Sequence, residues 1–170
     1  MNFHLIAKPV NALALLCLAV IATPASAQSI RANLEGFQEV PAVSSQASGK
    51  FRAHIDRHTN AITYELSYEG LEGDVTQAHI HFGQKSVNGG ISVFLCSNLG
   101  NGPVGTQLCP AAPATIYGTI QAADVGAGAG AQGIAAGELT ELIEAIREGV
   151  AYANVHSTKF PGGEVRGQIR

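Results

Sequence analysis

Short runs in which apolar and polar residues alternate, separated by turn sequences, fill most of the chain after residue 27. Alternation with a period of two places every second side chain on the same face, which is typical of β-strands. We expect eight strands, at residues 30–37, 50–56, 61–69, 75–82, 91–95, 114–122, 150–156 and 164–169. The polar turn at residues 57–60 is short enough to join two of these strands in a β-hairpin.

One segment has the periodicity of a helix instead. Between Glu138 and Glu148, four apolar residues follow the i, i+3, i+4, i+7 spacing of an amphipathic helix: Leu139, Leu142, Ile143 and Ile146. The stretch before it, residues 124–137, is rich in glycine and alanine, which favours a flexible loop over a packed element. The elements together predict an all-β fold, an antiparallel Greek-key sandwich or barrel, with one short helix.

Residues 1–27 have the three parts of a secretory signal peptide and are expected to lie outside the fold. Lys8 supplies the positive charge, residues 10–22 form an apolar stretch, and Ala25-Ser26-Ala27 is a cleavage site of small residues. The apolar stretch is shorter than the roughly 18 residues of a membrane span, and no later stretch reaches that length. We therefore predict an exported chain, periplasmic or secreted, with a single domain at residues 28–170.

The charges of this domain argue against one class of partner, and its cysteines predict a covalent link. Residues 28–170 contain nine Lys and Arg residues against thirteen Asp and Glu residues. The basic residues are scattered, so nucleic acid is not an expected partner. Cys96 and Cys109 are an even pair in a chain expected to be exported, which predicts a disulfide. Closing a loop of this size stabilises a fold by about 3 kcal/mol in the chain-entropy model.

The sequence AHIHFG at residues 78–83 places two imidazoles inside an apolar run. In an extended strand, successive side chains point to opposite faces. The alternate apolar residues of this run are expected to face the core. His79 and His81 then lie side by side on the other face, in a geometry that suits metal binding.

A second strand repeats this pattern. In residues 151–156 the alanines and valine share one face, and Tyr152, Asn154 and His156 share the other. If the two strands meet, His79, His81 and His156 converge into a site for one metal ion, with copper as the first choice and zinc as the second. A simpler interpretation stays open, because exposed histidines on the polar face of a strand are common.

The last predicted strand carries Glu164 and Arg166 on its polar face. Two interpretations are open for this pair. The two side chains are neighbours at i and i+2, so they can form an ion pair along the strand, which contributes little if it is exposed. Alternatively, they contact the histidines of the site and orient their rings, as a carboxylate does when it binds an imidazole ligand. We favour the ion pair.

Several motifs resemble the CHRD domain, and they occur in the order expected for it. They are LEG and EVP within residues 34–41, AHIHFG at 78–83, YANVHS at 152–157 and PGGEVRGQI at 161–169. The domain is named from chordin, an extracellular inhibitor of bone morphogenetic proteins, and also occurs in many exported bacterial proteins. The resemblance implies an immunoglobulin-like or barrel domain outside the cytoplasm and implies little about activity. Chordin's ligand binding is not implied, because this chain lacks its cysteine-rich modules.

The chain is also similar to Cu/Zn superoxide dismutase. That fold has a His-x-His strand followed by glycine and a later Val-His, so His79, His81 and His156 match three of its copper ligands. The dismutase also needs a histidine that bridges to zinc shortly after the His-x-His strand. No histidine lies between His81 and His156. The resemblance therefore implies at most a mononuclear three-histidine copper site, and superoxide dismutase activity is not expected.

These observations support three hypotheses from different classes. The first is an exported metal-binding domain that uses the three histidines. The second is a non-enzymatic interaction or adhesion domain with structural histidines and a protein or polysaccharide partner. The third is a hydrolase or oxidoreductase with the metal as cofactor. The sequence has no Ser-His-Asp framework and no free cysteine nucleophile, which favours the two non-enzymatic hypotheses.

Overall fold

The structure is a computed structural model that describes Met1 and residues 28–170. The signal-peptide prediction falls on a segment that, apart from Met1, lies outside these residues. The strands are β1 (Gln28–Glu35), β2 (Ser48–Asp56), β3 (Ala61–Glu69), β4 (Val75–Phe82), β5 (Gly90–Ser97), β6 (Ala114–Ile120), β7 (Ala151–Ser157) and β8 (Val165–Gln168). The helix α1 spans Leu139–Arg147, and three short 3-10 helices are η1 (Gly36–Gln38), η2 (Ala122–Asp124) and η3 (Ala127–Gln132). Each expected strand and the expected helix is present, with ends shifted by a few residues.

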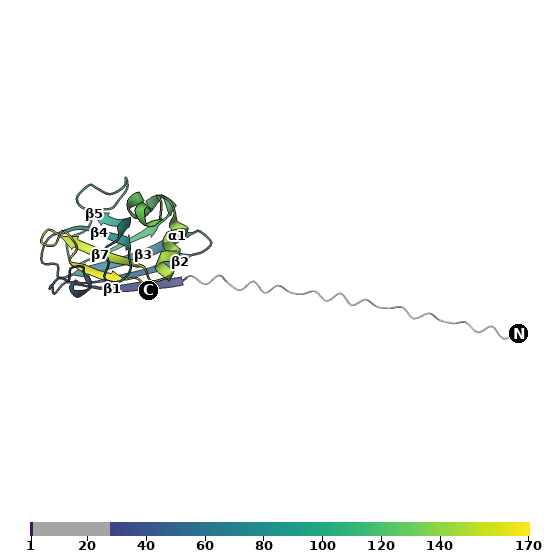
Figure 1. Cartoon of the computed structure of the whole chain (residues 1–170), viewed down its shortest axis with the longest axis horizontal. Helices are drawn as coiled ribbons and strands as arrows, with labels where there is room; N and C mark the ends of the chain where they lie inside the picture. Colours follow the sequence, from purple (N-terminus) through teal and green to yellow (C-terminus); the bar gives the residue numbers. More distant parts are fainter. Residues whose placement is uncertain (2–27) are drawn as a thin grey trace.

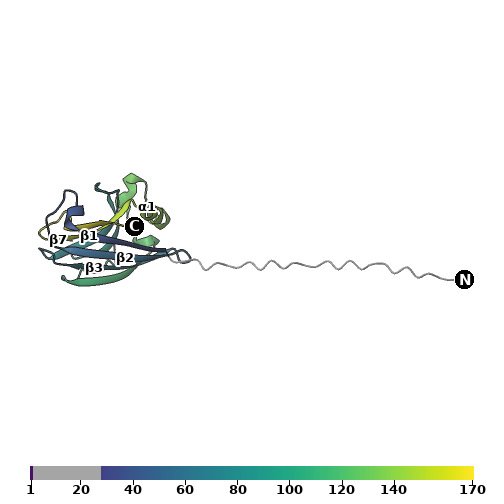
Figure 2. The ribbon, with the colours of Figure 1, turned by 90° about the horizontal axis from the view of Figure 1, so that it is seen from below.

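All eight strands pair antiparallel in one sheet, in the order β5-β4-β7-β8-β1-β2-β3-β6 (Figure 1). The sheet curls into a nearly closed barrel, which the view turned by 90° also shows (Figure 2). The gap between the two edge strands, β5 and β6, is bridged by side chains. The Gln107 amide donates hydrogen bonds to the Tyr64 hydroxyl and to the Tyr117 carbonyl of β6. The Tyr64 hydroxyl donates in turn to the Leu95 carbonyl of β5. The all-β antiparallel prediction is confirmed.

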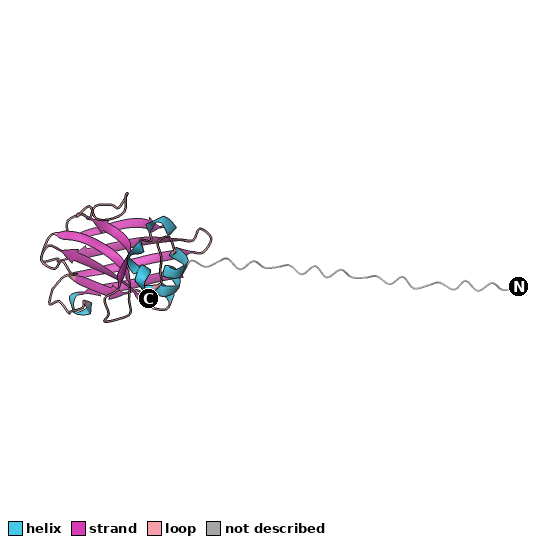
Figure 3. Ribbon diagram, turned by 45° about the horizontal axis from the view of Figure 1, so that its top comes forward, coloured by secondary structure: helices cyan, strands magenta, loops and turns pink. Residues whose placement is uncertain are grey.

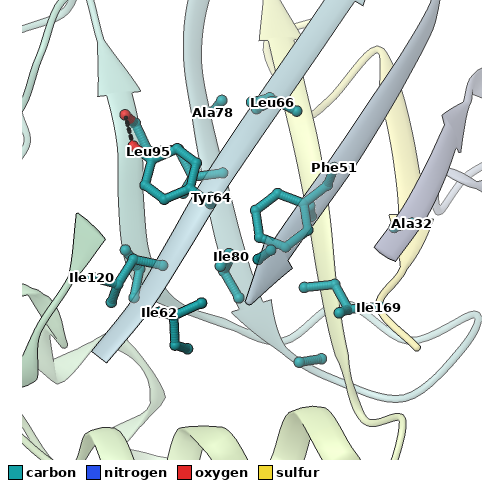
Figure 4. Close-up of a cluster of buried hydrophobic side chains, with 14 of the residues drawn as sticks. Ala32, Phe51, Ile62, Tyr64, Leu66, Ala78, Ile80, Leu95, Ile120 and Ile169 are labelled. Carbon is teal, nitrogen blue, oxygen red and sulfur yellow. Dashed lines mark hydrogen bonds between the residues drawn. The ribbon is translucent and has the colours of Figure 1, made fainter. Parts of the chain in front are cut away.

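Alternate side chains of the strands fill the interior of the barrel. The alternating pattern of β2 buries Phe51, and that of β3 buries Leu66, both completely. Figure 4 shows Phe51 and Tyr64 beside Ile80 of β4, with Leu95 accepting the hydrogen bond of Tyr64. Burial of such side chains is the main driving force for the fold.

The helix α1 covers one end of the barrel (Figure 3). Its buried residues are Leu139, Leu142, Ile143, Ala145 and Ile146. These include the four residues whose spacing predicted the helix. The amphipathic pattern therefore identified both the element and the face that packs on the strands.

The glycine- and alanine-rich stretch at residues 124–137 is not a flexible loop, so that prediction was wrong. It contains η3, which packs along the edge strand β5, and Ala129 is completely buried. A Cβ atom on Gly128 would lie only 2.3 Å from the carbonyl oxygen of Ile91. The small residues serve close backbone packing here, and composition alone does not distinguish this use from flexibility.

The predicted disulfide between Cys96 and Cys109 is present, with a sulfur–sulfur distance of 2.03 Å. It joins β5 to the loop that leads to β6. Asn98 supports the same loop, because its side chain accepts a hydrogen bond from the Cys109 N–H. Within the described part of the chain, no helix is long and apolar enough to cross a membrane.

Candidate metal centre

The three histidines singled out in the sequence meet on adjacent strands. His79 and His81 lie on β4 and His156 lies on β7, and Gln77 is opposite His156 while His79 is opposite Asn154. Opposed residues of an antiparallel pair share a face, so the three imidazoles lie together on the face turned away from the barrel interior. One ligand nitrogen of each ring lies within 4.8 Å of the other two.

This outer face is closed to solvent. The exposed fraction is 0% for His79, 7% for His81 and 6% for His156. The ring of Phe94 on β5 packs edge-on against His79, with 4.5 Å between ring centroids. Loops at residues 83–89 and 158–164 lie against the other two rings through backbone carbonyl groups. The interpretation of these histidines as solvent-exposed is therefore wrong.

Backbone carbonyls fix the proton position on two of the rings. Nδ1 of His81 lies 3.0 Å from the carbonyl oxygen of Gly89, and Nδ1 of His156 lies 2.9 Å from that of Pro161. A carbonyl oxygen only accepts hydrogen bonds, so each Nδ1 carries the proton of a neutral ring. The Nε2 atoms of both rings therefore keep lone pairs.

His79 links the other two rings and leaves one nitrogen without a partner. Its Nδ1 lies 3.1 Å from Nε2 of His156 and donates a hydrogen bond to that lone pair. Nε2 of His79 is buried and has no hydrogen-bond partner among the described residues. Two nitrogens bound to one ion at about 2.0 Å are roughly 3–4 Å apart. The 3.1 Å separation between His79 and His156 therefore suits a shared metal ion.

Burial keeps all three rings neutral. Burial, together with the nearby His156 and His81, lowers the pKa of His79 from 6.5 to about 2. Burial also lowers the pKa of His81 to about 4, against the opposite effect of its hydrogen bond to Gly89. The pKa of His156 is lowered for the same main reason. Neutral imidazole is the form that ligates metals, so at neutral pH these rings need no change of charge.

Tyr152 of β7 separates His81 from a buried cation. Its ring stacks on His81, with 4.7 Å between centroids and planes within 1° of parallel. The guanidinium carbon of Arg166, on the neighbouring strand β8, lies 3.4 Å from the centre of the same tyrosine ring. Because β7 lies between β4 and β8, the tyrosine is stacked between the two groups. Arg166 is thus in indirect contact with the histidine site.

Arg166 also holds the loop that covers His81. The residue is 2% exposed. Its guanidinium donates hydrogen bonds to the carbonyl oxygens of Gln84 and Val87 and to the side-chain oxygen of Asn88, at 2.8–3.2 Å. The same loop supplies the Gly89 carbonyl that fixes His81. The position of His81 therefore depends on β8 as well as on its own strand.

The ion pair favoured for Glu164 and Arg166 does not form. The ion pairs of the described residues are Arg52–Glu65, Arg147–Glu144 and Lys159–Glu72. Glu164 is completely buried, and its Oε1 accepts hydrogen bonds from the Ser45 hydroxyl and the Glu72 N–H. Glu164 precedes β8, which begins at Val165, and the two side chains make their contacts with different loops, so their i, i+2 spacing did not bring them together. A supporting role at the site stays a prediction for both residues.

Sequence reasoning missed Glu39 as a residue of this region. It follows η1 and is 6% exposed. Burial raises its pKa from 4.5 to about 7, although the charge of Arg166 and the contacts of Val40 and Asn154 oppose that change. Glu39 lies in the EVP motif, but a carboxylate beside proline in a connection is typical of an exposed turn. No signal in a single sequence indicates its burial.

A comparison with models of protein families identifies the family of this chain. The model of the CHRD domain matches residues 30–169, which include the three histidines, Glu39 and both cysteines. The chain belongs to the CHRD domain family. No curated protein and no solved structure matches the chain. The CHRD assignment made from the motifs is confirmed, and the similarity to Cu/Zn superoxide dismutase stays a prediction.

Proposed function

We propose that this CHRD domain binds a single metal ion through His79, His81 and His156. One observation carries the proposal: three buried, neutral imidazoles have nitrogens within 4.8 Å of one another. Buried polar atoms are nearly always paired, yet Nε2 of His79 has no partner among the described residues. A set of rings that served only to hold the two strands together would not need a buried nitrogen without a partner.

Copper is the first candidate and zinc the second. Imidazole nitrogen suits both metals, and copper(II) binds a given nitrogen site more tightly than the other divalent first-row ions. Three protein ligands leave a further position open on the ion. We place the protein outside the cytoplasm, because the sequence of residues 1–27 has the parts of a signal peptide and the domain contains a disulfide. No reaction forms part of the proposal.

The test uses protein purified without a histidine tag, because a tag would bind the same metals. The metal-free protein is titrated with Cu(II) and with Zn(II) by calorimetry, and bound metal is measured by elemental analysis after dialysis. We expect about one ion per chain, and loss of binding in the double variant His79→Ala with His81→Ala. The matched control replaces His54 and His58, which are exposed and lie on other elements.

The outcomes separate the hypotheses. Retention of one ion in the His54/His58 control and loss in the His79/His81 variant support the proposal. Absence of stoichiometric binding in the unmodified domain at neutral pH overturns it and favours the interaction domain with structural histidines. Equal loss in both variants points to non-specific binding by surface histidines and also overturns it.

A further inference from the structure

A buried carboxyl group is linked to the histidine site through Asn154, and one of its oxygens has no partner among the described residues. Glu39 is 6% exposed, and its Oε1 accepts no hydrogen bond within the described residues. A Cβ atom on Gly163 would lie 2.4 Å from that oxygen. The glycine thus leaves the space that the carboxyl occupies. An ionised carboxylate in such a position is costly unless an opposite charge compensates it.

Asn154 connects this carboxyl to the histidine site. It lies on β7 opposite His79. Its side-chain oxygen is 3.1 Å from Nε2 of His81, and its side chain also interacts with the carboxyl of Glu39. Glu39, Asn154 and His81 therefore form a chain of polar groups from the covering loop to one of the three ligands.

The hydrogen bonds of this chain cannot all be satisfied while Glu39 is ionised and Nε2 of His81 binds no cation. Neutral His81 carries its proton on Nδ1, toward Gly89, so its Nε2 has only a lone pair. With the Asn154 oxygen toward His81, two acceptors face each other. With the amide turned, its oxygen faces the carboxyl group of Glu39, which can donate a hydrogen bond to it only when it is protonated. A cation on Nε2 of His81 removes the conflict, because Asn154 then keeps its N–H for Glu39.

The charges around the site also indicate Glu39. Arg166 is a buried cation close enough to Glu39 to affect it, so a metal ion would add positive charge to a region that already contains a guanidinium. The other buried carboxyl group, Glu164, accepts hydrogen bonds from the Ser45 hydroxyl and the Glu72 N–H at its Oε1, both at 2.8 Å, and its Oε2 has no partner among the described residues; none of these contacts reaches a histidine. Glu39 is the carboxylate that is linked to a ligand.

We infer that Glu39 is a positioning residue of the metal site. Its negative charge compensates the bound cation, and through Asn154 it fixes the environment of His81. This inference rests on the proposed function. It has a consequence that a purely structural role lacks: the carboxylate stabilises a divalent ion more than a monovalent one. Replacing it should therefore weaken Cu(II) binding more than Cu(I) binding and raise the reduction potential of the bound copper.

The experiment compares Glu39→Gln with Glu164→Gln, which removes the other buried carboxylate of the region. At about pH 8, where carboxyl groups are ionised, Cu(II) and Cu(I) affinities are measured by competition with chelators of known affinity. Loss of a group that supports a metal ligand typically costs 10–100-fold in affinity. We expect about this loss for Cu(II) in Glu39→Gln, and a smaller loss for Cu(I). A tenfold difference between the two ions corresponds to about 59 mV in potential.

Two further variants keep the test decisive. Glu39→Asp retains the charge and should recover most of the Cu(II) affinity. If Glu39→Gln does not fold, as judged by circular dichroism, Asn154→Ala breaks the same connection and should shift the ratio of affinities in the same direction. We expect the paramagnetic resonance spectrum of Cu(II) to change in Glu39→Gln and to stay unchanged in Glu164→Gln.

The outcomes distinguish this inference from the proposed function. If the unmodified domain binds no copper, both are overturned. If it binds copper, and Glu39→Gln has the same ratio of Cu(II) to Cu(I) affinity, the inference is overturned and the proposed function stands. An equal change of that ratio in Glu39→Gln and Glu164→Gln also overturns the inference, because it indicates general electrostatics. A change confined to Glu39→Gln supports it.

Discussion

Nδ1 of His79 lies 3.1 Å from Nε2 of His156, and one proton lies between the two buried rings. The residues are 77 positions apart in the sequence, and the pairing of β4 with β7 brings them together. The proposed metal ion, if bound to both nitrogens, would take the place of this proton. Because the hydrogen bond already holds the two nitrogens at a spacing that suits two ligands of one ion, binding would need little rearrangement of the rings.

The buried histidines should make the metal-free protein less stable as the pH falls. The pKa of His79 is about 2 and that of His81 about 4 in the folded protein, against 6.5 as the ordinary value. Above pH 6.5 both histidines are neutral in the folded and in the unfolded protein, so they do not make the free energy of unfolding depend on pH. Below it the unfolded chain takes up protons that the folded chain does not, which costs about 1.4 kcal/mol per histidine and pH unit.

Glu39 changes the stability with pH in the opposite direction, so the variant Glu39→Gln serves as the control. Its pKa is about 7 when folded and 4.5 ordinarily, so its protonation favours the folded state as the pH falls through that range. From pH 7 to 5.5, His79 and His81 together cost about 2.5 kcal/mol and Glu39 offsets about 1.5 kcal/mol. We therefore expect the free energy of unfolding to decrease by about 1 kcal/mol in the unmodified protein and by about 2.5 kcal/mol in Glu39→Gln, and the lowered pKa of His156 adds to both decreases. Urea unfolding at both pH values measures it. A stability that rises toward pH 5.5 would contradict the neutral, buried state of the histidines.

The sequence predicted the histidine cluster because strand alternation is a local property. Each of His79, His81 and His156 alternates with apolar residues, which was sufficient to place them on one side of their strands. Alternation says nothing about what covers that side. The covering groups come from loops around Gly89 and Pro161, whose positions depend on the whole topology. Burial of the site was therefore beyond what the pattern indicates.

Small residues explain two other failures of prediction. Gly128 packs its backbone against Ile91, and Gly163 makes room for Glu39. In a single sequence, a glycine that permits close packing is indistinguishable from a glycine that permits flexibility. The η3 segment was for this reason taken for a loop, and the buried position of Glu39 could not be inferred at all.

Gly163→Ala should destabilise the protein and disturb Glu39. Gly163 has a backbone φ of +126°, which residues with a side chain rarely adopt. The added methyl group would also overlap the carboxyl of Glu39. We expect a loss of roughly 1–3 kcal/mol from the backbone alone. The neighbouring Gly162→Ala is the matched control, because a Cβ there meets nothing within 4 Å. Urea unfolding should show a change below about 0.5 kcal/mol for it, and equal effects at the two positions would refute the explanation.

Arg166→Met should release the loop over His81 while keeping most of the side-chain volume. The change removes the donors to Gln84, Val87 and Asn88. The acceptors belong to exposed loop residues, so water can replace the guanidinium there, and we expect a loss of about 1.5–3 kcal/mol, the range for one hydrogen bond to a charged group. Amide hydrogen exchange of residues 84–89 should accelerate more than that of β2 or β3. Arg52→Met is the control, because its ion pair with Glu65 is exposed and contributes little. Unchanged exchange in the loop would show that other contacts hold it.

Removal of the metal should lower the thermal stability of a loaded protein, and the size of the effect should follow the free metal concentration. A ligand that binds only the folded state stabilises it by about 4 kcal/mol at 1,000 times its dissociation constant. Differential scanning calorimetry with copper, and again after a chelator, measures the change. The His79→Ala variant should show no shift with copper, whereas His58→Ala, which changes an exposed turn residue, should respond like the unmodified protein. A copper-dependent rise in His79→Ala equal to that of the unmodified protein would place the metal elsewhere on the chain, because the proposed ion would take the place of the 3.1 Å contact between His79 and His156.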